Sequence, residues 1–256
     1  MISQKQQNII DSAISEYKSN GVCVVKGLLD TNEIELLQKE ASRLWSDQKD
    51  LNSLNLRVGT RKDLDGKDVL ERLDPVVDIS KIFSDLNEDE RILKLAEIAL
   101  GEKVMVMKEK LIYKWPGSSG YGAHRDGAYF KVSENAPESN EILSIIIALD
   151  KVDAENGATK FYPTLRFKEL ASPAEEARDI DDAEIEGEPF LMPELNPGDI
   201  VLFDGNMPHS SDFNKSQRTR RIYIITYAFN KYTNCREDYY ASRHKEMSKE
   251  RGLGTE

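Results

Sequence analysis

A histidine and an aspartate stand two positions apart in GAHRDGAYF (residues 122–130), and both side-chain types bind metal ions. We expect a β-strand here, because the run is rich in aromatic and small residues and is bounded by glycines. On a strand, residues i and i+2 point to the same face. His124 and Asp126 would then lie side by side while Arg125 points away. The alternative is that the pair is only a polar patch beside a turn.

A second histidine favours the metal site. His209 ends NPGDIVLFDGNMPH (196–209), in which a Pro-Gly turn precedes an apolar strand and a loop. Two histidines and one carboxylate form the facial triad of non-heme Fe(II) sites, which leaves coordination positions open. We therefore predict that His124, Asp126 and His209 bind one metal ion. His244, among charged residues near the C-terminus, is expected at the surface.

An arginine eleven residues after His209 is suited to hold a carboxylate. Arg220 begins the apolar strand predicted for RRIYIITYAFN (220–230), and a guanidinium presents a fork of donors that matches two carboxylate oxygens. Arg218 shares the strand face of Arg220, whereas Arg221 points to the other side. All three arginines remain candidates on this pattern alone.

Lysines alternate along the strand predicted for MVMKEKLIYKWPG (105–117), with Lys108, Lys110 and Lys114 on one face. Two interpretations stay open: a solvated strand face, or inward lysines that meet an anionic ligand. Tyr129 and Trp115 are suited either to line such a pocket or to belong to the core.

The composition is that of a globular protein large enough to bury a sizeable core: 256 residues, 39% hydrophobic and 32% charged. A net charge of -11 argues against general nucleic-acid binding, which needs clustered Lys and Arg. The N-terminus lacks a signal-peptide core, and no apolar run reaches about 18 residues; a cytoplasmic location without membrane partners is expected. Cys23 and Cys235 carry no motif spacing and are expected as free thiols.

The elements that must position these residues are helices first and strands afterwards. Hydrophobic periodicity and capping residues predict helices over 3–19, 30–48 and 87–101, with a strand over 21–29. Further strands are predicted over 103–115, 122–132, 142–152, 158–165, 189–195, 199–205 and 220–230. This order predicts a mainly β sandwich or jelly roll with the helices packed on one sheet.

We expect a single domain over 1–256, with helical support over roughly 1–101, a β core over roughly 102–230 and a C-terminal tail over 231–256. Residues 47–74 are expected to form a long surface segment, and the acidic residues 171–188 an exposed insertion. The final residues, 242–256, have the composition of a frayed helix or tail.

Four segments together resemble the phytanoyl-CoA dioxygenase family: HRD (124–126), NGATKFYP (156–163), NPGDIVLFDGNMPH (196–209) and SSDFNKSQRTRR (210–221). The resemblance covers roughly residues 20–230. It implies a double-stranded β-helix (jelly roll, cupin-like) that uses Fe(II), 2-oxoglutarate and O₂. It also implies that His124, Asp126 and His209 are the iron ligands, and that Arg220 pairs with the distal carboxylate of 2-oxoglutarate.

Other site residues follow from the same resemblance. Ser211 matches a hydroxyl at the distal carboxylate, and Lys108 falls near a polar side chain placed against the co-substrate. Arg72, in ERLDPVVDIS (71–80), falls in a segment that resembles a substrate-covering loop, with a surface salt bridge as the alternative. Lys110 and Tyr129 are further candidates for substrate contact. One departure is Pro163-Thr164-Leu165-Arg166, where the family usually has Gly-Ser-His.

The expected function is hydroxylation of an sp3 carbon of a small polar metabolite or natural-product intermediate, with release of succinate and CO₂. The same enzyme class also catalyses desaturation, epimerisation and oxidative cyclisation, and nothing in the ligands separates these outcomes. A non-catalytic cupin-like binding protein is a third hypothesis. The pattern is compatible with a monomer.

Overall fold

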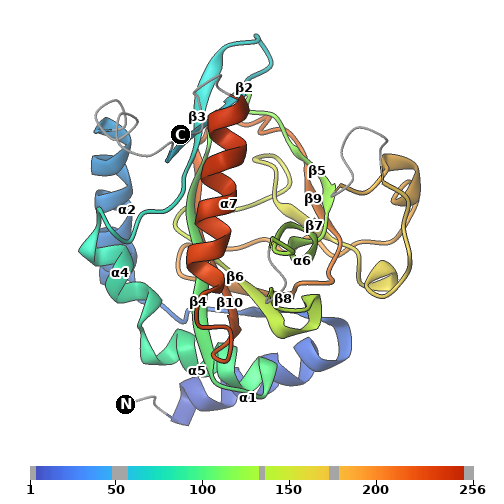
Figure 1. Cartoon of the computed structure of the whole chain (residues 1–256). Coiled ribbons are helices and arrows are strands. Elements are labelled where there is room, and N and C mark those ends of the chain that lie inside the picture. The colour runs from blue at the N-terminus through green and yellow to red at the C-terminus, as the bar shows by residue number, and fades with distance from the viewer. Residues whose placement is uncertain (1–3, 48–56, 133–135, 173–178, 251–256) are drawn as a thin grey trace.

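The computed structural model describes residues 4–47, 57–132, 136–172 and 179–250. Its largest element is a seven-stranded antiparallel sheet in the order β1-β8-β6-β10-β4-β3-β2 (Figure 1). Its strands are β1 (Val22–Val25), β2 (Val58–Lys62), β3 (Asp68–Leu73), β4 (Val104–Lys114), β6 (Ile142–Ala148), β8 (Ile200–Asp204) and β10 (Arg220–Phe229). A three-stranded antiparallel sheet has the order β5-β9-β7, with β5 (Tyr121–His124), β7 (Thr159–Phe161) and β9 (His209–Ser211).

The central strands of the large sheet supply two hydrophobic cores. Leu143, Ile145 and Ile147 of β6 pack with the N-terminal helices, whereas Ile146 and Ala148 pack in the core that includes the small sheet. Because successive residues of a strand face opposite sides, a strand covered on both faces reads as a continuous apolar run. The run ILSIIIA is buried at every position for this reason.

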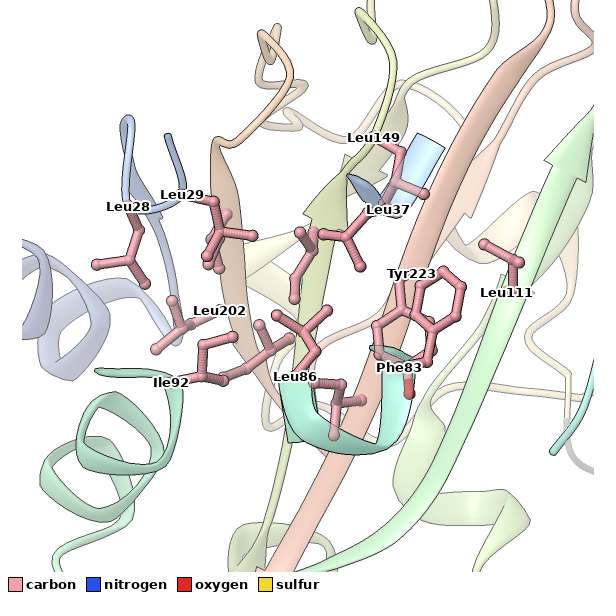
Figure 2. Close-up of a cluster of buried hydrophobic side chains, with 14 of the residues drawn as sticks. Leu28, Leu29, Leu37, Phe83, Leu86, Ile92, Leu111, Leu149, Leu202 and Tyr223 are labelled. Atoms are coloured by element: carbon pink, nitrogen blue, oxygen red, sulfur yellow. The ribbon is translucent and has the colours of Figure 1, made fainter. Parts of the chain in front are cut away.

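Four helices cover one face of the large sheet: α1 (Gln4–Asn20), α2 (Thr31–Ser46), α4 (Lys81–Asn87) and α5 (Glu90–Leu100) (Figure 1). Asp30 begins α2 with a capping box, since its carboxylate accepts from the Glu33 amide and Glu33 accepts from the Asp30 amide. Gly101 ends α5 at φ 79°, a left-handed conformation that favours glycine. In Figure 2, Phe83 and Leu86 of α4 lie against the sheet near Tyr223.

The C-terminal segment is a helix packed on the sheet, so the prediction of a tail from residue 231 is wrong. Helix α7 (Cys235–Glu250) lies along β4 (Figure 1). Arg236 donates to both carboxylate oxygens of Glu109, which is fully buried. A buried carboxylate requires such a partner. Tyr239 adds an apolar contact from the same helix. Residues 251–256 lie outside the described part.

Several other element predictions need correction. Within the segment expected at the surface, β2 and β3 form a hairpin that extends the large sheet; residues 48–56 lie outside the described part. The strand predicted over 122–132 ends at His124, and α6 (Asp126–Tyr129) follows. Residues 189–195 form only single bridges, at Leu191 and Leu195. Helix α4 and strand β9 were not predicted, because both are short and stabilised by tertiary contacts.

The mainly β architecture with helices on one sheet is confirmed. Cys23 and Cys235 are free, as predicted, and the structure buries both. Short 3-10 helices connect the strands at η1 (Ser139–Glu141), η2 (Pro163–Leu165) and η3 (Asp182–Glu184). Among the described helices, none is both long enough and apolar enough to cross a membrane. The assignment of 1–256 to one domain stays a prediction.

Candidate metal and co-substrate site

Strand pairing in the small sheet brings the two histidines together. His124, the last residue of β5, is paired in register with His209, the first residue of β9. Asp126 begins α6, one extended residue later. Its Oδ1 lies 3.8 Å from His124 Nε2 and 3.9 Å from His209 Nε2. One ligand atom from each of the three residues lies within 4.8 Å of the others, a spacing that accommodates a single metal ion.

The backbone presents the Nε2 atoms of both imidazoles to this space. His124 Nδ1 lies 2.9 Å from the Gly122 carbonyl oxygen, and His209 Nδ1 lies 3.0 Å from that of Met207. A carbonyl only accepts, so each Nδ1 carries the proton and each Nε2 keeps a lone pair. Burial, and then His209, lowers the pKa of His124 to about 4, and burial also lowers the pKa of His209. Both rings are therefore neutral, as a metal ligand must be.

A residue that the sequence reasoning missed orients the Asp126 carboxylate through the oxygen that does not face the histidines. Ser144 of β6 donates to Asp126 Oδ2, and its hydroxyl lies 3.1 Å from that of Thr226 on β10. Oδ1 is left facing the histidines. Burial by itself would raise the pKa of Asp126, but His209 and Lys110 outweigh it and bring the pKa to about 2. The only signal in the sequence is a serine within the apolar run ILSIIIA.

An inner cavity of about 40 Å³ adjoins the three ligands. Arg220, 2% exposed, lines this cavity and donates to the Gly157 carbonyl at 3.1 Å. Its Nε has no hydrogen-bond partner, and no carboxylate of the described residues lies within ion-pair distance. Burial lowers the pKa of Arg220 to about 10. Because an uncompensated buried charge is costly, this geometry fits an anionic ligand that completes the site.

The neighbouring arginines have other partners. Arg218 is exposed and pairs with the buried Asp153 and the exposed Glu155. Arg221 forms an ion pair with Asp150 at 2.8 Å. Of the three arginines that the sequence left open, Arg220 is therefore the one that lines the cavity.

Ser211 lies beside Arg220 in the wall of the inner cavity. Its hydroxyl accepts from Lys114 Nζ at 2.9 Å and from the Tyr121 amide at 3.3 Å. Lys114 also donates to the Asp212 carbonyl, and burial followed by the Arg220 cation lowers its pKa to about 6. The hydroxyl proton of Ser211 is thus free for a ligand, since both contacts use its lone pairs.

An outer cavity of about 190 Å³ shares His124 and Asp126 with the inner cavity. Of the predicted substrate residues, Arg72, Lys110 and Tyr129 all line it. Lys110 also lines the inner cavity; burial followed by Lys108 lowers its pKa to about 8. Tyr129 lies edge-on to His124, with ring centroids 5.6 Å apart, and donates to Asp179.

Lys108, predicted near the co-substrate, lines the outer cavity and not the inner one. It donates to Tyr239 and lies 3.6 Å from Asp74. The alternation on β4 thus turns Lys108, Lys110 and Lys114 inward. This arrangement excludes the interpretation that the lysines form a solvated strand face. Trp115 packs against Trp45 and Tyr113 instead of lining either cavity, and His244 is exposed.

The sequence reasoning missed several residues of the outer cavity, three of them from segments expected to lie apart from the site. Tyr239 and Arg243 come from α7, and Asp179 comes from the acidic segment expected to be an exposed insertion. Asp179 forms an isolated bridge with His124. Residues 173–178 of that segment lie outside the described part.

Comparison with known proteins identifies the family. The family model "Phytanoyl-CoA dioxygenase (PhyH)" matches residues 17–222. A methylphosphonate hydroxylase of Gimesia maris is 31% identical over 161 residues, which are 62% of this chain and 58% of that protein. A 2-aminoethylphosphonate dioxygenase of an uncultured bacterium is 24% identical over 237 residues, 92% of this chain and 88% of that protein.

A solved structure has the same fold. The structure of the epimerase SnoN in complex with Fe3+, alpha ketoglutarate and nogalamycin RO has a TM-score of 0.72 at 20% identity. The match covers 87% of this chain and 84% of that one. At this identity the likeness shows the fold, and it confirms the predicted jelly roll. With the family model matching most of its length, the chain belongs to the phytanoyl-CoA dioxygenase family, a family of Fe(II)- and 2-oxoglutarate-dependent oxygenases.

Proposed function

We propose that this protein hydroxylates an sp3 carbon of a small polar metabolite, using Fe(II), 2-oxoglutarate and O₂ and releasing succinate and CO₂. One observation carries the proposal: three convergent ligand atoms adjoin a cavity in which a buried arginine has no carboxylate partner among the described residues. The first feature fits a metal ion, and the second fits the far end of a dicarboxylic acid.

The donor set fits ferrous iron. Two neutral imidazole nitrogens and one carboxylate oxygen suit this ion, and three protein ligands leave positions open for other molecules. When bound, the iron would supply the activation of O₂ and the oxidation of a C–H bond. Gly122, Met207 and Ser144 hold the ligand atoms in place through the hydrogen bonds described above. Such outer contacts orient ligands and tune metal affinity.

The inner cavity is suited to 2-oxoglutarate. Arg220 would hold the distal carboxylate through its fork, and Ser211 would donate its hydroxyl proton to the same group. Lys114 and Tyr121 fix the position of Ser211. The remaining wall is largely apolar, with Ile112, Ile146, Phe203, Ile222 and Ile224. Such a wall excludes water and strengthens the arginine–carboxylate interaction.

The outer cavity is the proposed substrate site, because it adjoins the metal ligands and has the larger volume. Its volume of about 190 Å³ lies below the roughly 300 Å³ at which pockets for drug-sized ligands begin. A small substrate fits, whereas an acyl-CoA would have to extend outside. The names of two relatives, a methylphosphonate hydroxylase and a 2-aminoethylphosphonate dioxygenase, support a small polar substrate.

Two alternatives use the same residues. Desaturation, epimerisation or cyclisation requires the same site, and the product mass separates these outcomes from hydroxylation. A binding protein without turnover would take up metal and 2-oxoglutarate but release no succinate.

The test is anaerobic reconstitution with Fe(II) and 2-oxoglutarate, followed by exposure to air and measurement of succinate. We expect succinate formation that increases with a panel of small phosphonates and amino acids. Asp126→Ala should abolish it with the fold intact. Asp68→Ala is the matched control, because this carboxylate is exposed and pairs with Lys62 on the hairpin. Unchanged succinate formation in Asp126→Ala, or no binding of iron by the wild type, would refute the proposal.

A further inference from the structure

The outer cavity carries an excess of positive charge. Five basic side chains line it, against the two carboxylates Asp126 and Asp179. Two more carboxylates, Glu71 and Asp74, lie behind the wall and pair with lining residues. Five cations against four carboxylates leave one positive charge, and a ferrous ion would add two. The basic residues are Arg61, Arg72, Lys108, Lys110 and Arg243.

These cations differ in how far they are neutralised. Arg61 and Arg72 share Glu71, at 2.7 and 2.6 Å. Lys108 has Asp74 and the Tyr239 hydroxyl. Lys110, in contrast, forms neither a hydrogen bond nor an ion pair with the described residues.

Arg243 has only a weak partner, since its one ion pair with described residues reaches Glu246 at 3.9 Å. Lys110 and Arg243 are therefore the cations of this cavity whose donors are available to a ligand.

The two available cations come from different elements. Lys110 lies on β4 and faces both cavities, and Arg243 lies on α7, four residues after Tyr239, on the same helix face. A lysine supplies a point charge, and an arginine supplies a planar fork. A tetrahedral dianion can accept from both at once, because its oxygens point in different directions.

We propose that Lys110 and Arg243 bind the tetrahedral dianionic headgroup of the substrate, a phosphonate or a phosphate monoester. This inference rests on the proposed function, since it places the headgroup beside the metal ligands. The aromatic rings of Tyr129, Phe130 and Tyr239 complete the wall around the rest of a small substrate. The contribution of α7 makes the C-terminal helix part of the specificity site.

The experiment measures binding by calorimetry under anaerobic conditions, with Fe(II) and saturating 2-oxoglutarate. Methylphosphonate and methyl phosphate are the dianionic probes, and methanesulfonate is the monoanionic probe of similar shape. We expect both dianions to bind at least ~10-fold more tightly than the monoanion, because two cations face the headgroup. Aerobic turnover then separates the two substrate classes. If methyl phosphate is oxidised and methylphosphonate is not, the substrate is a phosphate monoester. If methylphosphonate is oxidised and methyl phosphate is not, the substrate is a phosphonate.

Arg243 is the decisive position because it lines only the outer cavity. Arg243→Gln should weaken methylphosphonate binding at least ~10-fold, Arg243→Lys should recover part of the loss, and Lys110→Gln should weaken it similarly. Lys245→Gln is the matched control, since Lys245 is an exposed cation on the same helix, and it should stay within about twofold. Unchanged affinity for 2-oxoglutarate in the two Arg243 variants, whose position lines only the outer cavity, shows that the site is still folded.

The failures are distinguishable. If the wild type binds 2-oxoglutarate and forms succinate, but the dianions bind no better than methanesulfonate or bind equally to Arg243→Gln, the headgroup site is refuted and the proposed function stands. If the wild type binds neither iron nor 2-oxoglutarate, the proposed function itself falls.

Discussion

Replacing Arg220 with methionine should make the ligand-free protein more stable and at the same time remove its affinity for 2-oxoglutarate. The pKa of Arg220 lies at about 10 because of burial, below the usual 12.5. At about 1.4 kcal/mol for each tenfold change in the proton equilibrium, this corresponds to about 3 kcal/mol against the buried cation. Methionine is apolar and of similar length, so it avoids this cost. It also loses the hydrogen bond to Gly157, at about 1 kcal/mol.

The free energy of unfolding of Arg220→Met should therefore rise by about 2 kcal/mol, which urea denaturation of the metal-free protein measures. Binding should change in the opposite direction, because two charge-assisted hydrogen bonds to a carboxylate contribute about 3–6 kcal/mol. The Kd for 2-oxoglutarate, measured by calorimetry, should increase at least ~100-fold.

Lys215→Met is the control, because Lys215 is exposed and forms no ion pair with the described residues. It should change stability by no more than about 0.5 kcal/mol and leave 2-oxoglutarate binding intact. A destabilised Arg220→Met variant that still binds 2-oxoglutarate normally would show that Arg220 is structural, and would refute the reasoning.

Three further predictions concern the metal ligands and α7. Ser144→Ala removes the donor to Asp126 Oδ2 and should weaken Fe(II) binding about 10- to 100-fold in a chelator competition; equal affinity would contradict the orienting role. Burial lowers the pKa of His124 from 6.5 to about 4, so between pH 6.5 and pH 4 this imidazole takes up a proton only in the unfolded protein. The metal-free protein should thus lose up to about 3 kcal/mol as the pH falls from 6.5 to 4, and His124→Asn should flatten this dependence in urea denaturation. Arg236→Ala leaves Glu109 charged and unpaired in the core, where burial already raises its pKa. The free energy of unfolding should fall by about 3–5 kcal/mol. The double variant Arg236→Ala/Glu109→Gln should recover part of this loss, as measured by thermal denaturation.

The relative placement of side chains that are close in sequence was predicted well, because strand geometry repeats every two residues. The alternation on β4 placed Lys108, Lys110 and Lys114 on one face, and the structure has this arrangement. The same rule placed His124 and Asp126 together, although α6 replaces the end of the predicted strand. One extended residue between them was sufficient for the pair to converge.

Residues far apart in sequence were predicted less well. Ser144 reaches Asp126 because β6 lies beneath the small sheet, and no local period in the sequence shows this contact. The lysine face was ambiguous for the same reason: alternation defines two faces but not which of them is covered. The composition of the last residues favoured a frayed helix or tail, whereas the buried Glu109–Arg236 pair attaches helix α7 to β4.

By itself, the sequence determined the three candidate ligands, a short list of arginines after them and the mainly β fold. Each of these depends on local spacing, on the period of a strand, or on a family pattern of neighbouring residues. Only the tertiary structure decided which arginine lacks a carboxylate partner, which lysines face which cavity, and that α7 contributes to the wall of the outer cavity. Those properties depend on burial and on charges brought from distant segments, and a partner more than a hundred residues away leaves no mark in the local pattern.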